Sequence, residues 1–217
     1  MRKTISNLAL AVIATGSVSA AAITWDAPIV NTTAADISTD GTLHIASNSA
    51  GPTDQTINGV TFSAQSGGPL ASNASGTFYT TGGGVNTTGD IGLDTLLDSH
   101  SYQGGGGANF DIIGLTSGDT YEIQIIGVGD TRGCCATREQ NFSDDGVVFS
   151  GDLLRSDPSS VIGTFLADAA TQNIIVGGAT DPGLSGFQVR NISTIPEPGT
   201  ALLSFAGLLG MALRRRR

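Results

Sequence analysis

The fold is decided by the stretch Gly114-Leu115-Thr116-Ser117-Gly118-Asp119-Thr120-Tyr121-Glu122-Ile123-Gln124. In its second half Tyr121 and Ile123 point to one face, while Glu122 and Gln124 point to the other, as in a half-buried β-strand. Its first half is a turn sequence in which Gly118 can take a positive φ. The stretch therefore predicts a β-hairpin, with the preceding strand at Asn109 to Ile113 as its partner.

Short apolar runs between clusters of Gly, Ser, Thr, Asn and Asp continue on both sides of this hairpin, a pattern typical of β-strands. We predict ten strands, at Ile23–Val30, Leu43–Ala46, Thr56–Phe62, Thr77–Thr80, Asn109–Ile113, Thr120–Val128, Val147–Ser150, Val161–Ala167, Asn173–Val176 and Ser185–Ile192. Only Asp94 to Ser99 has a helical pattern.

These elements predict an all-β domain at residues 23–192, folded as an antiparallel β-sandwich of the jelly-roll type. The length of this region is sufficient for one domain with its own core. A β-solenoid is the alternative, because Gly, Asn and Asp are abundant. The sequence shows no fixed period of about 20–30 residues, so the sandwich is favoured.

Residues 1–22 have the pattern of a secretory signal peptide. Arg2 and Lys3 precede an apolar run from Leu8 to Val18, and the small residues Ser19 to Ala22 follow. The apolar run is too short for a permanent membrane anchor. We expect this signal helix to direct export and to be removed by cleavage among the small residues.

The C-terminal end has three parts in a fixed order. A linker at residues 193–198 contains Pro196, Glu197 and Pro198, and the prolines keep the chain extended. Residues 199–217 then form an apolar helix, Ala201 to Leu213, followed by the cationic block Arg214, Arg215, Arg216 and Arg217. A helix of this length spans about 20 Å, less than the roughly 30 Å core of a bilayer. The short membrane helix therefore suits temporary retention, with the arginines in the cytoplasm.

This Pro-Glu-Pro motif, apolar helix and terminal arginine cluster resemble the PEP-CTERM sorting signal of Gram-negative bacteria. The resemblance implies export, transient association with the inner membrane and cleavage by an exosortase-type sorting protease. It also implies a final place at the cell surface or in the extracellular matrix.

Between the two targeting segments the chain is strongly acidic. Residues 23–198 contain four arginines, no lysine and all nineteen acidic residues, a formal charge of −15. Nucleic acids and anionic lipids bind to basic faces, so the composition excludes a nucleic-acid partner.

The segment from Gly127 to Asn141 is the most unusual part of the predicted domain, because it contains both cysteines. Cys134 and Cys135 are adjacent. In an oxidising compartment they either pair with each other or bridge to another chain. A bond between them would form a stiff apolar turn, which either braces the loop or packs against a ligand.

Polar candidates for a ligand site surround these cysteines. Asp130, Arg132 and Arg138 combine a carboxylate with planar donors that suit sugar hydroxyls, and Tyr102 could stack on a sugar ring. The same Asp–Arg pair would also serve as a loop brace.

The stretch Gly114 to Gln124, followed by Asp130-Thr131-Arg132, resembles the hairpin of galactose-binding-like and malectin-like jelly rolls in exported bacterial proteins. The resemblance implies a carbohydrate-binding or adhesion module, and no residue of a specific sugar site is matched.

Metal and catalytic motifs are sparse. One structural Ca²⁺ is conceivable beside the tight turns at Asp144-Asp145-Gly146 or Asp36 to Gly41, but no calcium-loop motif is complete, so no cofactor or metal ligand is assigned. The chain has two histidines and no Gly-x-Ser-x-Gly elbow. We therefore predict no catalytic residues and a non-enzymatic role, binding exopolysaccharide or another glycan. A purely structural matrix protein is the alternative, and a glycan hydrolase is the least favoured reading.

Overall fold

The computed structural model describes residues 22–64, 78–82, 86–103, 108–178 and 180–193. Within these ranges the chain is mostly β, with one α-helix and one turn of 3₁₀ helix. The predicted signal helix, apart from Ala22, and the predicted membrane helix with its Pro-Glu-Pro motif lie outside the described residues. Within the part of the chain that the structure describes, no helix is long and apolar enough to cross a membrane.

The strands form three sheets. The largest has the order β1 (Thr24–Trp25), β12 (Ser159–Leu166), β9 (Thr120–Ile126), β15 (Gly186–Asn191), β3 (Thr42–Asn48), β5 (Val60–Ala64) and β4 (Gln55–Ile57), and β2 (Ile29–Val30) also pairs with β12. The second has the order β11 (Leu153–Leu154), β10 (Glu139–Ser143), β13 (Thr171–Gly178) and β8 (Ala108–Ile113). The third has the order β14 (Gly183–Leu184), β7 (Ser99–Gln103) and β6 (Phe78–Gly82).

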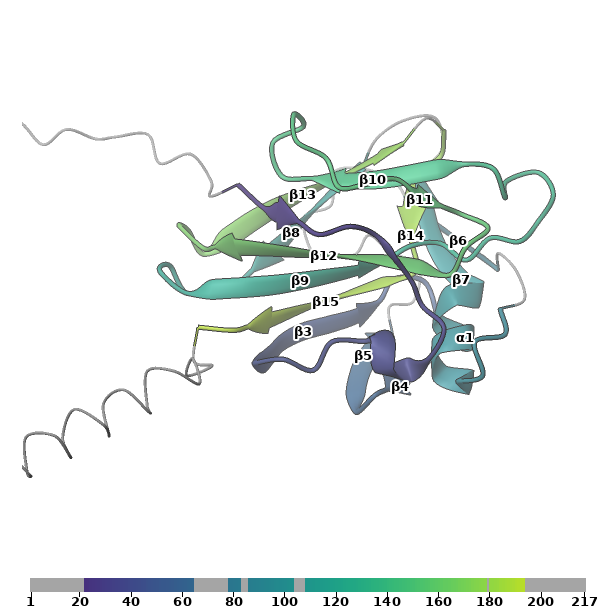
Figure 1. Ribbon diagram of the computed structural model, residues 1–217, viewed down its shortest axis with the longest axis horizontal. Coiled ribbons are helices and arrows are strands. Elements are labelled where there is room, and N and C mark those ends of the chain that lie inside the picture. Colours follow the sequence, from purple (N-terminus) through teal and green to yellow (C-terminus); the bar gives the residue numbers. More distant parts are fainter. Residues whose placement is uncertain (1–21, 65–77, 83–85, 104–107, 179, 194–217) are drawn as a thin grey trace, which may run out of the picture.

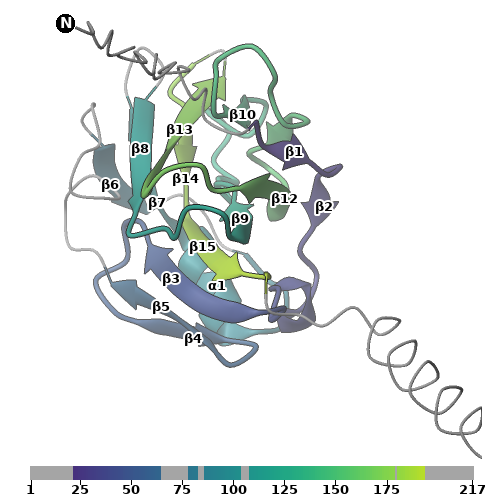
Figure 2. The same cartoon turned by 90° about the vertical axis from the view of Figure 1, so that its left-hand side faces the viewer.

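The first two sheets face each other and form the predicted all-β sandwich (Figures 1 and 2). Its core lies between them. The second sheet contributes Phe110, Phe142 and Ile174, and the largest sheet contributes Tyr121 and Phe187. One pairing departs from the predicted antiparallel arrangement, because β3 and β5 run parallel. The jelly-roll connectivity remains a prediction.

The predicted hairpin between residues 109–113 and 120–128 is wrong. β8 pairs with β13 in the second sheet, whereas β9 pairs with β12 and β15 in the first. The connection from Gly114 to Asp119 therefore crosses between the sheets, and the 167–170 connection crosses back beside it, with Ala167 N–H donating to the Asp119 carbonyl at 2.8 Å. Alternation of residues fixes the face of a strand but not its partner, and a glycine at positive φ suits either connection.

On the outer face of the largest sheet, the part formed by Gln124, Gln188 and Arg190 is polar but covered. Residues 31–41, including the 3₁₀ turn η1 (Ala34–Asp36), cross this face in Figure 1. Gln124, which alternation places on the outer face, has no exposed surface. Its amide donates to the Asp36 carbonyl at 2.7 Å and accepts from Ser38 N–H at 3.0 Å. Arg190 contributes further bonds to the carbonyls of this covering segment.

A second core lies around α1 (Ile91–Asp98), which is longer than the predicted turn. Asp90 caps the helix, accepting from Leu93 N–H at 2.8 Å. The helix packs on β4 and β7. The strands β4 and β5 were predicted as one, but Asn58-Gly59, at φ of 48° and 76°, turns the chain between them.

Four strands were not predicted: β7, β10, β11 and β14. The predicted strand at Val147–Ser150 is instead a loop with a single bridge from Phe149 to Ser143. Figure 1 places β7, β11 and β14 at the end of the sandwich where β9 finishes. The candidate site lies among these elements.

Candidate functional site

The loop that follows β9 is held in place by a backbone ladder. Asp130 N–H donates to the Arg155 carbonyl at 2.7 Å, and Arg155 N–H donates to the Arg138 carbonyl at 2.9 Å. Ser156 N–H donates to the Ala136 carbonyl at 3.1 Å. These bonds bring the loop and the segment after β11 together, so that arginines distant in sequence meet.

A pocket of about 230 Å³ opens at this junction. Its lining residues are Tyr102, Arg132, Cys134, Cys135, Arg138, Arg155 and Asp181. Thus the structure brings together the ligand-loop residues that the sequence singled out, except that Asp130 lies beneath the surface with no exposed area. Arg155 and Asp181 were missed. Arg155 is one of only four arginines between the targeting segments, and that scarcity is the signal that could have identified it.

Asp130 and Arg132 form a bidentate ion pair. Arg132 Nε donates to Asp130 Oδ1 at 2.9 Å, and Arg132 Nη2 donates to Asp130 Oδ2 at 2.7 Å. Burial alone would raise the pKa of Asp130, but the hydrogen bonds from Arg132 outweigh it and hold the pKa below its usual value. The Arg132 side chain keeps 43% of its surface exposed, so the pair braces the loop while the guanidinium still borders the pocket.

Arg138 pairs across the pocket with Asp181, at 2.5 Å between Nη1 and Oδ2. Both side chains are partly exposed, at 28% and 26%. Asp181 has a positive φ of 45°, which is uncommon outside glycine. The pair closes one side of the pocket and leaves donors on Arg138 beside it.

Arg155 is the exceptional member of the group. It is only 2% exposed, and its Nε and Nη2 have no hydrogen-bond partner among the described residues. Burial lowers the pKa of the Arg155 guanidinium, and the nearby Asp130 opposes that shift. The lack of a side chain at Gly183 makes room for the guanidinium, since a Cβ there would lie 3.0 Å from Nη2.

His100 lies behind the pocket, with its ring 6.1 Å from that of Tyr102. The side chain is fully buried, and neither ring nitrogen has a partner among the described residues. Burial first, and then the charge of Arg155, lower the pKa of His100 to about 4. The ring is therefore neutral at pH 7 and adds no charge to the site.

The structure joins Cys134 to Cys135 by a disulfide, with their Cα atoms 3.8 Å apart. Cys135 is 6% exposed, and its N–H donates to the Arg132 carbonyl at 3.0 Å. The bond forms one wall of the pocket, next to Arg132 and Arg138.

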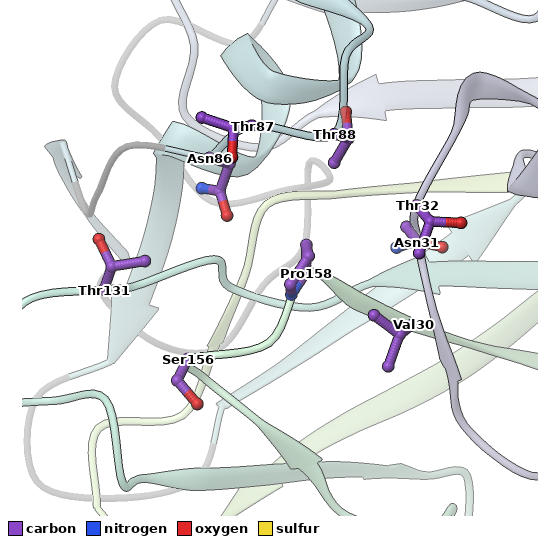
Figure 3. Close-up of a pocket in the computed structure, with 9 residues that line it drawn as sticks. All are labelled: Val30, Asn31, Thr32, Asn86, Thr87, Thr88, Thr131, Ser156 and Pro158. Carbon is purple, nitrogen blue, oxygen red and sulfur yellow. The ribbon is translucent and has the colours of Figure 1, made fainter.

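A second cavity, of about 300 Å³, lies near the first pocket (Figure 3). Thr131 and Ser156 line it, whereas their chain neighbours Arg132 and Arg155 line the first pocket. All of its lining residues are uncharged: Val30, Asn31, Thr32, Asn86, Thr87, Thr88, Thr131, Ser156 and Pro158. Asn31 is fully buried, and its amide nitrogen has no partner among the described residues.

In the acidic turns considered for calcium, the carboxylates of Asp36 and Asp145 accept hydrogen bonds from backbone N–H groups of the same turn. Asp36 Oδ2 accepts from Thr32 N–H at 2.7 Å and Thr33 N–H at 2.9 Å. Asp145 Oδ1 accepts from Val147 N–H at 2.7 Å and Val148 N–H at 2.9 Å. Among the residues that the structure describes, no three His, Cys, Asp or Glu side chains gather as a metal site. The expectation of no cofactor, with one structural calcium as the alternative, stays a prediction.

Comparison with known proteins identifies the C-terminal end of the chain. Residues 194–217 match the model of the PEP-CTERM protein-sorting motif. This match, which covers the predicted Pro-Glu-Pro motif, helix and arginines, marks the chain as an exported protein sorted by an exosortase in Gram-negative bacteria.

The chain also has distant structural likenesses to solved proteins. No curated protein matches the chain. A calcium-binding mutant of Bacteroides uniformis beta-glucuronidase 2 aligns over 68% of this chain and 18% of its own, at 18% identity and a TM-score of 0.45. The family GH115 4-O-methyl-alpha-glucuronidase BtGH115A aligns over 62% and 20%, at 12% identity and a TM-score of 0.33. The chain thus spans about a fifth of the length of either structure.

Proposed function

We propose that this chain is a cell-surface or extracellular-matrix protein whose β-sandwich binds carbohydrate without turning it over. In this proposal the sandwich is a jelly roll of the galactose-binding-like type, and the PEP-CTERM tail is removed after transient retention in the inner membrane. The pocket lined by Tyr102, Arg132, Arg138 and Arg155 is the binding site.

The observation that carries the proposal is the convergence of planar donors and an aromatic ring on one pocket. Three of the four arginines between the targeting segments line it, although this region is strongly acidic. Guanidinium groups donate several hydrogen bonds in a fixed plane, and tyrosine offers both a ring face and a hydroxyl. This combination suits a sugar, which presents an apolar ring face edged by hydroxyl groups.

The acids of the pocket favour binding over hydrolysis. A glycosidase needs one carboxyl group with a raised pKa as its general acid and a second, ionised carboxylate. Asp130 is buried against Arg132, and its pKa is lowered rather than raised. Asp181 is engaged by Arg138. Two carboxylates already neutralised by arginines are better suited to holding donors in place.

A glycan array probed with the exported protein tests the proposal, in calcium and again in chelator because one structural calcium is the alternative to a domain without a cofactor. We expect saturable binding that Tyr102→Ala weakens by roughly tenfold, since stacking and hydroxyl contacts are lost. Ile91→Ser is a matched surface control, because Ile91 is 85% exposed and lies on α1.

Two outcomes would redirect the assignment. If the protein binds no polysaccharide, including that of its producer, the proposal fails and a purely structural matrix role takes its place. If incubation with a polysaccharide releases reducing ends, the domain is a hydrolase instead.

A further inference from the structure

We infer that the pocket beside the Cys134–Cys135 disulfide takes a single carboxylated sugar unit, with its carboxylate against the guanidinium of Arg155. The inference rests on the proposed carbohydrate-binding function and adds the class of sugar.

The charges around the pocket do not balance. Arg132, Arg138 and Arg155 supply three positive charges, while Asp130 and Asp181 supply two negative ones, leaving a net charge of +1. The region between the targeting segments is otherwise strongly acidic, so a local positive excess is unexpected from composition. One monoanionic group would make the pocket neutral.

The unpaired charge resides on Arg155. The bidentate Asp130–Arg132 pair and the Arg138–Asp181 pair each satisfy one arginine. Arg155, at 2% exposure, is in neither pair, and two of its nitrogens have no partner among the described residues. A buried charge without a counterion is costly, and a ligand that supplies the counterion recovers that cost.

The shape of the site favours a carboxylate. Guanidinium and carboxylate groups are both planar and form paired, parallel hydrogen bonds. The remaining donors of Arg138 and Arg132 border the same space of about 230 Å³, which is the size of one sugar unit rather than of an extended chain. Because the domain as a whole is acidic, it would repel a dense polyanion. A single acidic sugar in a largely neutral polymer fits both the pocket and the overall charge.

The test uses the exported protein and the extracellular polysaccharide of its producer, native and after reduction of its carboxyl groups to primary alcohols. The reduced polymer keeps its backbone and hydroxyls and loses only the charge. Binding is measured at about 0.15 M salt, where the Debye length of about 8 Å screens long-range repulsion. We expect the wild-type protein to bind the reduced polymer at least tenfold more weakly than the native one.

Arg155→Met separates ligand binding from stability. We expect it to bind the native polymer at least tenfold more weakly, and to show no fall in its urea unfolding midpoint, because a buried charge without a partner has been removed. Arg155→Lys keeps a charge but not the planar fork, and we expect an intermediate affinity. Arg190→Met is the matched control, because Arg190 is also buried but lies outside the pocket. We expect this substitution to lower stability and to leave affinity unchanged.

The failures are distinguishable. Equal binding of native and carboxyl-reduced polymer, or wild-type affinity in Arg155→Met, overturns the inference while the carbohydrate-binding function stands. Loss of binding after desulfation of the polymer, with carboxyl reduction having no effect, also overturns it, in favour of a sulfated sugar. Failure of the wild-type protein to bind any polysaccharide overturns the proposed function itself.

Discussion

Arg155 and Arg190 are both buried, at 2% and 7% exposure, yet their surroundings differ completely. Arg190 donates to the carbonyls of Thr39 and Gly41 and to Gln188 Oε1, so its charge is satisfied by backbone and amide dipoles. Arg155 has neither a carboxylate partner nor carbonyl acceptors of this kind among the described residues. Arg190 therefore anchors the covering segment, whereas Arg155 is the residue whose charge the inferred ligand would neutralise.

The Asp130–Arg132 pair yields the first stability prediction. Arg132→Ala leaves a fully buried carboxylate without its bidentate partner, and we expect it to cost about 2 kcal/mol of unfolding free energy, since Arg132 is itself partly exposed. Urea unfolding at pH 7 measures this loss. The double variant Asp130→Asn/Arg132→Ala should recover about half of it, because the charge is gone. A double variant less stable than Arg132→Ala would contradict the argument.

His100 predicts a dependence of stability on pH. Its folded pKa of about 4 lies below its ordinary value of 6.5, so the unfolded chain binds the proton first as the pH falls. The associated stability is present above pH 6.5 and is lost as the pH falls towards 4. By pH 4.5 the loss is on the order of 2–3 kcal/mol.

His100→Met checks this assignment, because methionine fills a similar buried volume without a titrating group. Between pH 7 and pH 4.5 the urea midpoint should fall less in the variant than in the wild-type protein. The difference between the two falls is the contribution of His100. Parallel pH profiles for the two proteins would show that the acid sensitivity comes from other groups.

At the level of elements, period-two alternation predicted correctly which face of a strand each side chain lies on. It did not predict which strands pair. Tyr121 and Ile123 were expected in the core and Gln124 on the opposite face, and the structure agrees. The strand at Asn109 to Ile113 was expected to pair with theirs, but its Phe110 reaches the same core from the second sheet. Nothing in a strand's own sequence says which strand lies next to it, because pairing is decided by long-range packing.

The segment that covers the outer face gives a prediction for a whole element. Arg190→Met removes donors to the Thr39, Asp40 and Gly41 carbonyls, and we expect a loss of about 2 kcal/mol in unfolding free energy. Amide exchange should accelerate first in residues 31–41, including Ser38, whose N–H is held by Gln124. Equal acceleration in β9 would contradict local detachment, since β9 lies in the centre of the sheet.

The sequence identified some residues of the candidate site, but it did not show which other residues lie beside them. The loop from Asp130 to Arg138 stood out because it holds both cysteines and half of the region's four arginines. Arg155 reaches it through β10, which is largely polar, and β11, which has only two residues, so neither strand shows a period in the sequence. Asp181 sits in a turn just before β14. Contacts set by register between such short strands cannot be read from local pattern.

The basic residues of the whole molecule lie in few places. Six of the ten lie at the two ends of the chain. Three of the other four line one pocket. The intervening region carries nineteen acids, so that pocket is a local exception to its negative charge. Removal of the C-terminal end would therefore make the protein more acidic without altering its site.

Cleavage within the sorting tail is the prediction for the whole molecule. The sorting motif matches residues 194–217, so the protein recovered from outside the cell should lack Arg214 to Arg217. Intact-mass spectrometry of the secreted protein measures this directly. Replacing Pro196, Glu197 and Pro198 by alanines should leave the full-length chain in the inner-membrane fraction, because the predicted apolar helix would keep it there until the protease acts. Leu202→Ile, a conservative change within the apolar run, is the control and should be processed normally. An intact arginine end on the secreted wild-type protein would mean that the tail is not a cleaved signal.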